Sequence, residues 1–337
     1  MLVEVNSPSM FDLSSLPKAE LHLHLEGAPR WSTLRSAHYR HYGTVLPQTP
    51  PWYAPSFRFA NFGEFQKLFK QYIHPWLQVP TGYAEVIRDV VDGLLAQNIR
   101  YAEVNFAPSM VEQHGASLSQ VWDILEAEVN RAQEQGYIIR IFVGLMRPQG
   151  TEAAIYWVKQ TRSMPIVAGF DLQGEEVGWP ADQFRLAFDL ASAADKRVKV
   201  HVGEMTGPES IQTAVEELGI TQIGHGTSAV QSPDVVALLR DRQVTVEMCP
   251  TSNERLQNVT CYRDHPIFEL DATGIAVTVN SDDPTFYGLN LTEEFSRLVA
   301  ERQATLSDVK RWTRNAFRRA LLDNDTRNRL VAELDNF

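Results

Sequence analysis

The chain of 337 residues carries a formal net charge of -11 and contains 44% hydrophobic and 22% charged residues. This acidic balance argues against a nucleic-acid-binding protein, because such proteins use basic surfaces to neutralise phosphates. No apolar stretch is long enough to span a bilayer. Residues 1–16 lack the basic start and apolar core of a signal peptide. We therefore expect a cytoplasmic protein whose two cysteines, Cys249 and Cys261, are free thiols.

Short runs typical of buried parallel strands alternate with helical stretches along the chain. These runs cover residues 19–25, 101–106, 138–145, 166–172, 198–202, 222–226, 244–248 and 276–280. Residues 119–135 place apolar side chains close to a 3.6-residue period, and 210–218 and 233–242 follow the same pattern. The alternation predicts a single α/β domain over residues 1–337, a (β/α)8 barrel of the TIM type. An open doubly wound sheet is the alternative, but no glycine-rich phosphate loop follows any strand.

A long insertion separates the first two predicted strands, over about residues 28–98. It contains a proline- and aromatic-rich stretch at 47–55 and a helical pattern at 62–76. Insertions that follow a barrel strand lie over the active-site face, so we expect a helical lid, with a simple linker as the alternative. The many aromatic residues argue against disorder. Residues 306–334 are expected to form helices that close the domain.

The first predicted strand contains two histidines, His22 and His24, one residue apart. Residues i and i+2 of a strand point to the same face, so both imidazoles are directed at one point. His201 ends the fifth predicted strand and Asp282 follows the eighth. The active site of such a barrel lies at the C-terminal ends of its strands, so these side chains are expected to converge. Three imidazoles and one carboxylate suit a single divalent ion with room for a water.

Further polar residues follow the same strand ends. Glu204 lies just past the fifth strand, where a carboxyl with a raised pKa can protonate a ring nitrogen or a leaving group. His225 lies between two glycines and is a candidate to hold or to deprotonate a water at the metal. Asp283 is expected to bind substrate, since it and Asp282 cannot easily face one ion together. Gly174 can offer its backbone to a flat ligand, with a simple βα turn as the alternative explanation.

Taken in order, the segments around these residues resemble the adenosine deaminase family of the amidohydrolase superfamily. The matching segments are PKAELHLHLEG at 17–27, GFDL at 169–172, HVGE at 201–204, IGHG at 223–226, CPTSN at 249–253 and SDDP at 281–284. The resemblance implies a hydrolase that converts a small-molecule 6-aminopurine to a 6-oxopurine and ammonia. It implies one Zn²⁺ per subunit, bound by His22, His24, His201 and Asp282.

The resemblance also implies roles for the neighbouring residues. Glu204 would protonate N1 of the purine while an activated water attacks C6. His225 and Asp282 would orient that water. Asp283 would hydrogen-bond to N7, and the backbone N–H of Gly174 would meet N3.

The substituent on the purine is the open question in this resemblance. Glu26 stands where many family members carry an aspartate that reaches the ribose 5′-hydroxyl, and His24 is implied to contact substrate as well as metal. Glutamate at this place is frequent in the branch that acts on adenine. The segment after Asp283, at 284–295, is closer to the nucleoside branch. We therefore expect an adenosine-like substrate, with adenine, N6-substituted adenines and aminodeoxyfutalosine as alternatives.

Two other classes of function stay open at this stage. One is a different amidohydrolase, which cleaves an amide, a lactone or a phosphoester. Binuclear amidohydrolases usually carry a lysine at the end of strand four, where this chain has Asp171, Gln173 and Gly174, which favours one metal. The other is a non-catalytic purine-binding barrel, which predicts a broken ligand set that this sequence does not show. No membrane or nucleic-acid partner is expected, and the sequence does not indicate an oligomeric state.

Overall fold

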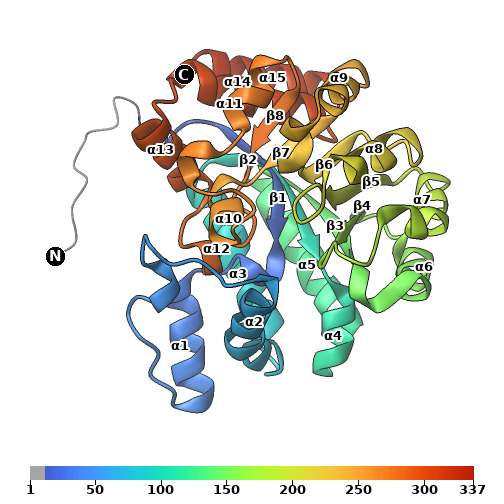
Figure 1. Cartoon of the computed structure of the whole chain (residues 1–337). Coiled ribbons are helices and arrows are strands. Elements are labelled where there is room, and N and C mark those ends of the chain that lie inside the picture. The colour runs from blue at the N-terminus through green and yellow to red at the C-terminus, as the bar shows by residue number, and fades with distance from the viewer. Residues whose placement is uncertain (1–11) are drawn as a thin grey trace.

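The computed structural model describes residues 12–337, which form a ring of parallel strands surrounded by helices (Figure 1). Residues 1–11 lie outside the described part. They make up most of residues 1–16, for which no signal peptide is expected. The strands are β1 (Lys18–His24), β2 (Ile99–Phe106), β3 (Ile138–Met146), β4 (Val167–Gln173), β5 (Arg197–Val202), β6 (Gln222–His225), β7 (Thr245–Met248) and β8 (Ala276–Val279). They follow one another from β1 to β8 in a single 8-stranded sheet, so the predicted TIM-type α/β barrel is confirmed.

The barrel closes between its first and last strands at the C-terminal end of β1. Leu23 forms a parallel bridge with Asp282. The backbone N–H of His24 donates to the carbonyl of Asp282 at 3.0 Å, and the N–H of Asp282 donates to the carbonyl of His22 at 3.1 Å. Asp282 has a φ of 65°, a left-handed conformation that non-glycine residues adopt mainly where surrounding structure enforces it. Closure of the barrel therefore places two histidines beside one aspartate.

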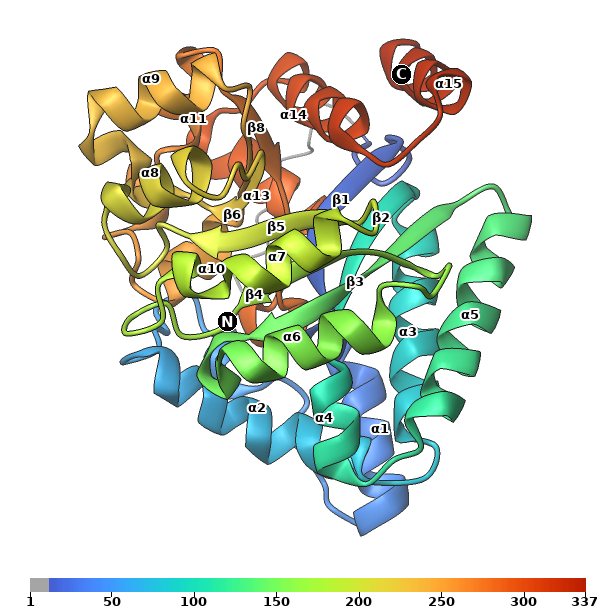
Figure 2. The same cartoon turned by 90° about the vertical axis from the view of Figure 1, so that its right-hand side faces the viewer.

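The helices connect the strands and cover the outside of the barrel (Figures 1 and 2). In chain order they are α1 (Trp31–Tyr42), α2 (Phe62–Leu77), α3 (Gly82–Ala96), α4 (Pro108–His114), α5 (Leu118–Glu134), α6 (Gly150–Thr161), α7 (Arg185–Ser192), α8 (Pro208–Glu216), α9 (Pro233–Asp241), α10 (Pro250–Arg255), α11 (Ile267–Ala272), α12 (Pro284–Tyr287), α13 (Leu291–Arg302), α14 (Leu306–Arg319) and α15 (Asn324–Asp335). The helices predicted from periodicity correspond to α5, α8 and α9. None of the helices within residues 12–337 has the length and hydropathy needed to cross a membrane.

The insertion between β1 and β2 divides into two parts. Helix α3 packs against α5 and β2, as a helix of the barrel's outer ring does. Helices α1 and α2 pack against each other and lie at the end of the barrel away from α14 and α15 (Figures 1 and 2). The proline- and aromatic-rich stretch between them is anchored by Trp52, whose indole N–H donates to the carbonyl of Thr285 at 3.2 Å. The Trp52 ring also packs edge-on against Trp31, with centroids 5.2 Å apart.

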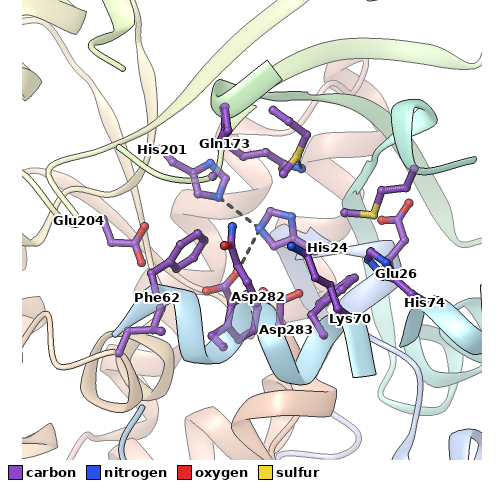
Figure 3. A pocket seen from close by; sticks show the side chains of 18 of the residues that line it. His24, Glu26, Phe62, Lys70, His74, Gln173, His201, Glu204, Asp282 and Asp283 are labelled. Carbon is purple, nitrogen blue, oxygen red and sulfur yellow. Dashed lines mark hydrogen bonds and ion pairs between the residues drawn. The ribbon is translucent and has the colours of Figure 1, made fainter. Parts of the chain in front are cut away.

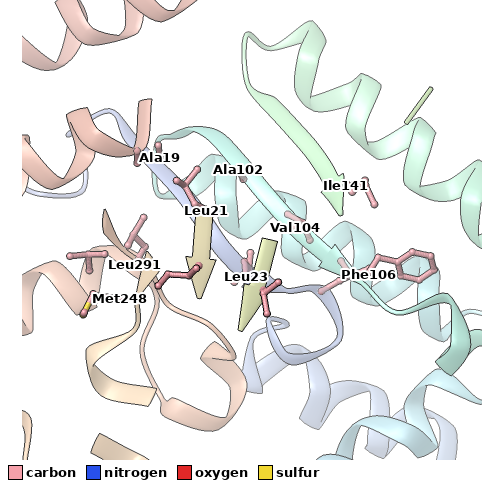
Figure 4. Packing of buried hydrophobic residues seen from close by; sticks show 14 of the residues in the cluster. Ala19, Leu21, Leu23, Ala102, Val104, Phe106, Ile141, Met248 and Leu291 are labelled. Atoms are coloured by element: carbon pink, nitrogen blue, oxygen red, sulfur yellow. The ribbon is translucent and has the colours of Figure 1, made fainter. Parts of the chain in front are cut away.

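Alternation along β1 separates an apolar face from a polar one. Leu21 and Leu23 belong to the buried apolar core, which also contains Val104 of β2 and Leu291 of α13 (Figure 4). Burial of such side chains contributes about 25 cal/mol per Å² of apolar surface, so this layer holds the strands and helices together. The alternate residues of β1 point to the other face, the interior of the barrel.

Charged side chains fill the barrel interior. The Lys199 ammonium of β5 lies 3.3 Å from a carboxylate oxygen of Glu103 on β2 and 3.4 Å from one of Glu247 on β7, and all three side chains are fully buried. The side-chain amide of Gln222 donates to Glu103 at 2.8 Å. These contacts join strands that are not neighbours in the sheet, so they are possible only across the interior. Removing one partner of such a network leaves an uncompensated buried charge, at a cost of about 3–5 kcal/mol.

Candidate active site

The four predicted metal ligands meet at the C-terminal ends of β1, β5 and β8. Figure 3 shows His24, His201 and Asp282 of this set. Nε2 of His24 lies 3.1 Å from Oδ1 of Asp282, and Nε2 of His22 lies 3.5 Å from the same oxygen. Nε2 of His201 lies 3.2 Å from Nε2 of His24. Ligand atoms about 2.1 Å from a tetrahedral metal are separated by about 3.4 Å. The spacing of these donor atoms therefore suits one divalent ion.

Carboxylates behind two of the histidines set the direction of their lone pairs. Nδ1 of His201 lies 3.0 Å from Oδ1 of Asp171, and Nδ1 of His22 lies 3.2 Å from Oε2 of Glu247. A carboxylate can only accept at these positions, so the proton of each neutral ring resides on Nδ1 and the lone pair on Nε2 faces the cluster. Nε2 of His22 is buried without a hydrogen-bond partner. A buried lone pair without a hydrogen-bond partner, with three other ligand atoms directed at the same point, fits a bound cation.

Replacing Asp171 with asparagine is expected to weaken metal binding by about 10–100-fold, the usual effect of losing a partner behind a metal-binding histidine. Asp171 is buried and also accepts from the side-chain amide of Asn105 at 2.8 Å. Burial alone would raise the pKa of Asp171, but His201 and Lys199 together hold it below its usual range. The metal Kd, measured by competition with a chelator, should increase. Exchange of the exposed Asp189 of α7 for asparagine is the matched control, and equal Kd values in the two variants would contradict the prediction.

Glu204 is buried at the wall of the same site. Its Oε1 accepts from the side-chain amide of Asn258 at 3.0 Å, and its Oε2 lies 3.5 Å from Nε2 of His225. Burial raises the pKa of Glu204 well above its usual value, and the nearby carboxylates of Asp282 and Glu176 raise it further. A raised pKa favours the protonated form of the carboxyl group, which can serve as a proton donor.

The loop that carries Glu204 is held by a second glutamate, Glu176. Its carboxylate accepts the backbone N–H groups of Gly203 at 2.8 Å, Glu204 at 3.1 Å and Met205 at 2.8 Å. The hydroxyl of Thr206 donates to the same carboxylate. Three consecutive N–H groups on one carboxylate fix the backbone of the loop and hence the position of the Glu204 side chain.

His225 ends β6 in a strained conformation close to the histidine cluster. Its φ is 61°, and its ring centroid lies 4.8 Å from that of His22. A Cβ on the preceding Gly224 would lie only 2.8 Å from Cε1 of His22. Glycine at that position is therefore needed for the strand that carries His225 to lie so close to His22.

The three remaining predicted residues line the same cavity from different sides. Burial raises the pKa of Asp283 to about 8, and a side chain at Gly27 would collide with its carboxyl group. Glu26 accepts the backbone N–H of Ala107 at 3.1 Å, and its burial raises its pKa to about 7, although that hydrogen bond acts in the opposite direction. Gly174 has a φ of 93°, a conformation that disfavours other residues.

These residues surround a cavity of about 280 Å³. Among the predicted residues, only His22 does not line it, because His22 is fully buried behind the other ligands. Helix α2 supplies the apolar wall through Phe62, Phe65 and Phe69. Figure 3 shows Glu204 and His201 on one side of His24, and Glu26, His74 and Lys70 on the other. Glu204 thus lies on the opposite side of His24 from Glu26.

Comparison with known proteins agrees with this geometry. The family model for adenosine deaminase matches residues 17–337. An aminodeoxyfutalosine deaminase of Streptomyces avermitilis is 32% identical over 332 residues, which cover 96% of this chain and 92% of that protein. An adenosine deaminase of Enterococcus faecalis is 30% identical over 329 residues, which cover 95% and 96%. The crystal structure of an adenine deaminase from Arthrobacter aurescens aligns with a TM-score of 0.87 and 26% identity, over 96% of this chain and 99% of that one. This chain belongs to the adenosine deaminase family and is a hydrolytic deaminase of the purine type.

Proposed function

We propose that the chain is a zinc-dependent deaminase that converts a 6-aminopurine nucleoside to the 6-oxopurine and ammonia. The observation that carries this proposal is the position of Glu204, a buried carboxyl group with a raised pKa that lines the same cavity as His24, His201 and Asp282. His22, His24, His201 and Asp282 would hold a divalent ion, which would supply an activated water as the nucleophile at neutral pH.

The protein residues then act on the purine ring. Glu204 gives its proton to N1, which makes C6 more electrophilic, and this proton stays on N1 in the product. The oxygen of water becomes the 6-oxo group. One proton of water leaves with the amino group as ammonia and the other returns to Glu204, so atoms and protons balance. Asp283 would hold N7 and the N–H of Gly174 would hold N3, which orients the ring. The apolar face of α2 would keep bulk water from the reacting carbon.

The position of Glu26 and His74 across His24 from Glu204 supports a substituent on the purine. With C6 at the Glu204 end, N9 on the far side of the ring faces the end that contains Glu26 and His74. The relatives named above are deaminases of aminodeoxyfutalosine, of adenosine and of adenine. In our proposal, the space beside Glu26 determines which of these classes of substrate this chain accepts. His24 lies between the two ends and would contact both metal and substrate.

Ammonia release from a panel of substrates tests the proposed function. Protein loaded with zinc is mixed separately with adenosine, 2′-deoxyadenosine, adenine, aminodeoxyfutalosine and N6-methyladenine. We expect ammonia or methylamine from at least one compound, with nucleosides turned over faster than adenine. A faster reaction with adenine would assign the chain to the adenine branch instead. If no member of the panel yields an amine, the proposal is wrong.

Exchanging Glu26 for aspartate is expected to shift preference toward nucleosides. Loss of one methylene at the N9 end opens space for ribose, and one methylene in a pocket changes selectivity by about 10-fold or more. The ratio of kcat/KM for adenosine to that for adenine should increase accordingly. Glu26→Gln keeps the length of the side chain and serves as the control, for which the ratio should change less. An unchanged ratio in Glu26→Asp would remove Glu26 as the residue that selects the substituent.

A further inference from the structure

His225 stands at the end of a chain of hydrogen bonds that begins at the protein backbone. The N–H of Ile267, the first residue of α11, donates to Nδ1 of His265 at 3.3 Å. A backbone N–H can only donate, so Nδ1 of His265 must accept. Burial lowers the pKa of His265 to about 3, and the nearby Arg302 acts in the same direction. The neutral ring of His265 therefore carries its one proton on Nε2.

The side chain of Asn253 links His265 to His225 and fixes which ring nitrogen of His225 accepts a hydrogen bond. Nε2 of His265 lies 3.1 Å from the side-chain oxygen of Asn253, and a protonated ring nitrogen requires an acceptor there. The orientation of the amide, oxygen toward His265 and nitrogen toward His225, therefore follows from the backbone donor. The amide nitrogen of Asn253 then faces Nδ1 of His225 at 3.1 Å. His225 accepts at Nδ1, so its proton lies on Nε2, which points into the site.

The position of this proton decides which role His225 can take. One nitrogen each of His22, His201 and His225 lie within 4.8 Å of one another, close enough for all three to hold one ion. A nitrogen that carries a proton cannot coordinate a metal, and it cannot accept a proton from water. It can only donate a hydrogen bond. His225, Asn253 and His265 are all buried, and of these three only His225 lines the cavity, so solvent offers Asn253 and His265 no alternative partners.

We propose that Asn253 and His265 are positioning residues that hold His225 as a hydrogen-bond donor toward the oxygen that adds to C6. His225 is then neither a metal ligand nor the base that deprotonates water, the second of which the sequence left open. Donation from Nε2 stabilises negative charge on that oxygen, and removal of one such preorganised donor typically costs about 10²–10³-fold in kcat. This inference rests on the proposed function and assigns the role of one residue within it.

Nitrogen-15 NMR of the histidine rings tests the inference without any substrate. The zinc-loaded protein is labelled at histidine, and the His225 signals are assigned by their loss in His225→Gln. We expect long-range couplings that place the proton of His225 on Nε2. A proton on Nδ1 in the wild-type protein would overturn the inference. A correct tautomer with no amine released by the substrate panel would overturn only the proposed function.

The variant Asn253→Asp gives a second test, because it reverses the direction of the hydrogen bond to His225. A carboxylate still accepts from His265 but cannot donate, so the proton of His225 should move to Nδ1 in the same spectra. We expect kcat to fall about 100-fold, with a smaller change in KM, because the donor acts on the reacting oxygen. Asn290→Asp, at the N-cap of α13 and outside the cavity, is the matched control and should leave kcat unchanged. An unchanged tautomer or an unchanged kcat in Asn253→Asp contradicts the proposal, and the wild-type spectrum decides the question if this variant fails to fold.

Discussion

Glu204→Gln is expected to lower kcat for a 6-aminopurine substrate by about 10²–10⁴-fold while the metal stays bound. Glutamine keeps the size of the side chain and the acceptor for the Asn258 amide, 3.0 Å away in the wild type. It has no acidic proton to give to N1, so C6 stays a poor electrophile. Ammonia release gives kcat, and elemental analysis of the purified variant gives the metal content.

Two further measurements separate proton donation from damage to the site. Burial raises the pKa of Glu204, and the protonated form is the active one, so the rate should hold below this pKa and fall as pH increases through it. That limb of the pH profile should be absent in Glu204→Gln. Glu216→Gln, at the exposed end of α8, is the matched control and should behave as the wild type. A kcat near the wild-type value in Glu204→Gln would show that another group protonates the ring.

The barrel was predictable because each strand is locally marked by apolar residues and each strand end by polar ones. The charged interior was not. Lys199 lies between valines, and nothing near it in the sequence is its partner. Its contacts, Glu103 and Glu247, come from two other strands and meet it only when the sheet closes. An alternating pattern of this kind is normally typical of a lysine exposed to solvent, and only the closed sheet shows that it is buried.

The candidate site shows the same division between local and distant information. The spacing of His22 and His24 fixes their common direction within a single strand, so sequence alone suffices for them. Glu176 and His265 act from segments between strands and helices, and no local pattern marks them. Glu176 lies four residues after the GFDL segment and two after Gly174, and this proximity is the only sequence signal that pointed near it. A role that depends on which backbone groups a side chain contacts can be recognised only in the folded structure.

Adjacent aspartates at the end of β8 are expected to give opposite results when each is replaced by asparagine. Asp282→Asn should lose the metal and the activity together, because Oδ1 of Asp282 lies 3.1 Å and 3.5 Å from two of the imidazoles. The affinity for the metal should fall further than in Asp171→Asn, for which about 10–100-fold is expected because Asp171 contacts a ligand and not the metal. Asp283→Asn should keep the metal and raise KM, because Asp283 faces the purine in our proposal. The two variants remove the same group one residue apart, so each is the control for the other.

Thermal unfolding with and without a chelator distinguishes the two roles independently of turnover. A metal that binds only the folded chain stabilises it by about 2.7 kcal/mol at a free concentration 100 times its Kd. The Tm of the wild type and of Asp283→Asn should therefore fall on chelation, whereas that of Asp282→Asn should not. Oxygen and nitrogen atoms of His24, Asp282 and Asp283 also lie within 4.8 Å of one another, which is the competing ligand set. A Tm of Asp283→Asn that is insensitive to the chelator would place Asp283 among the ligands.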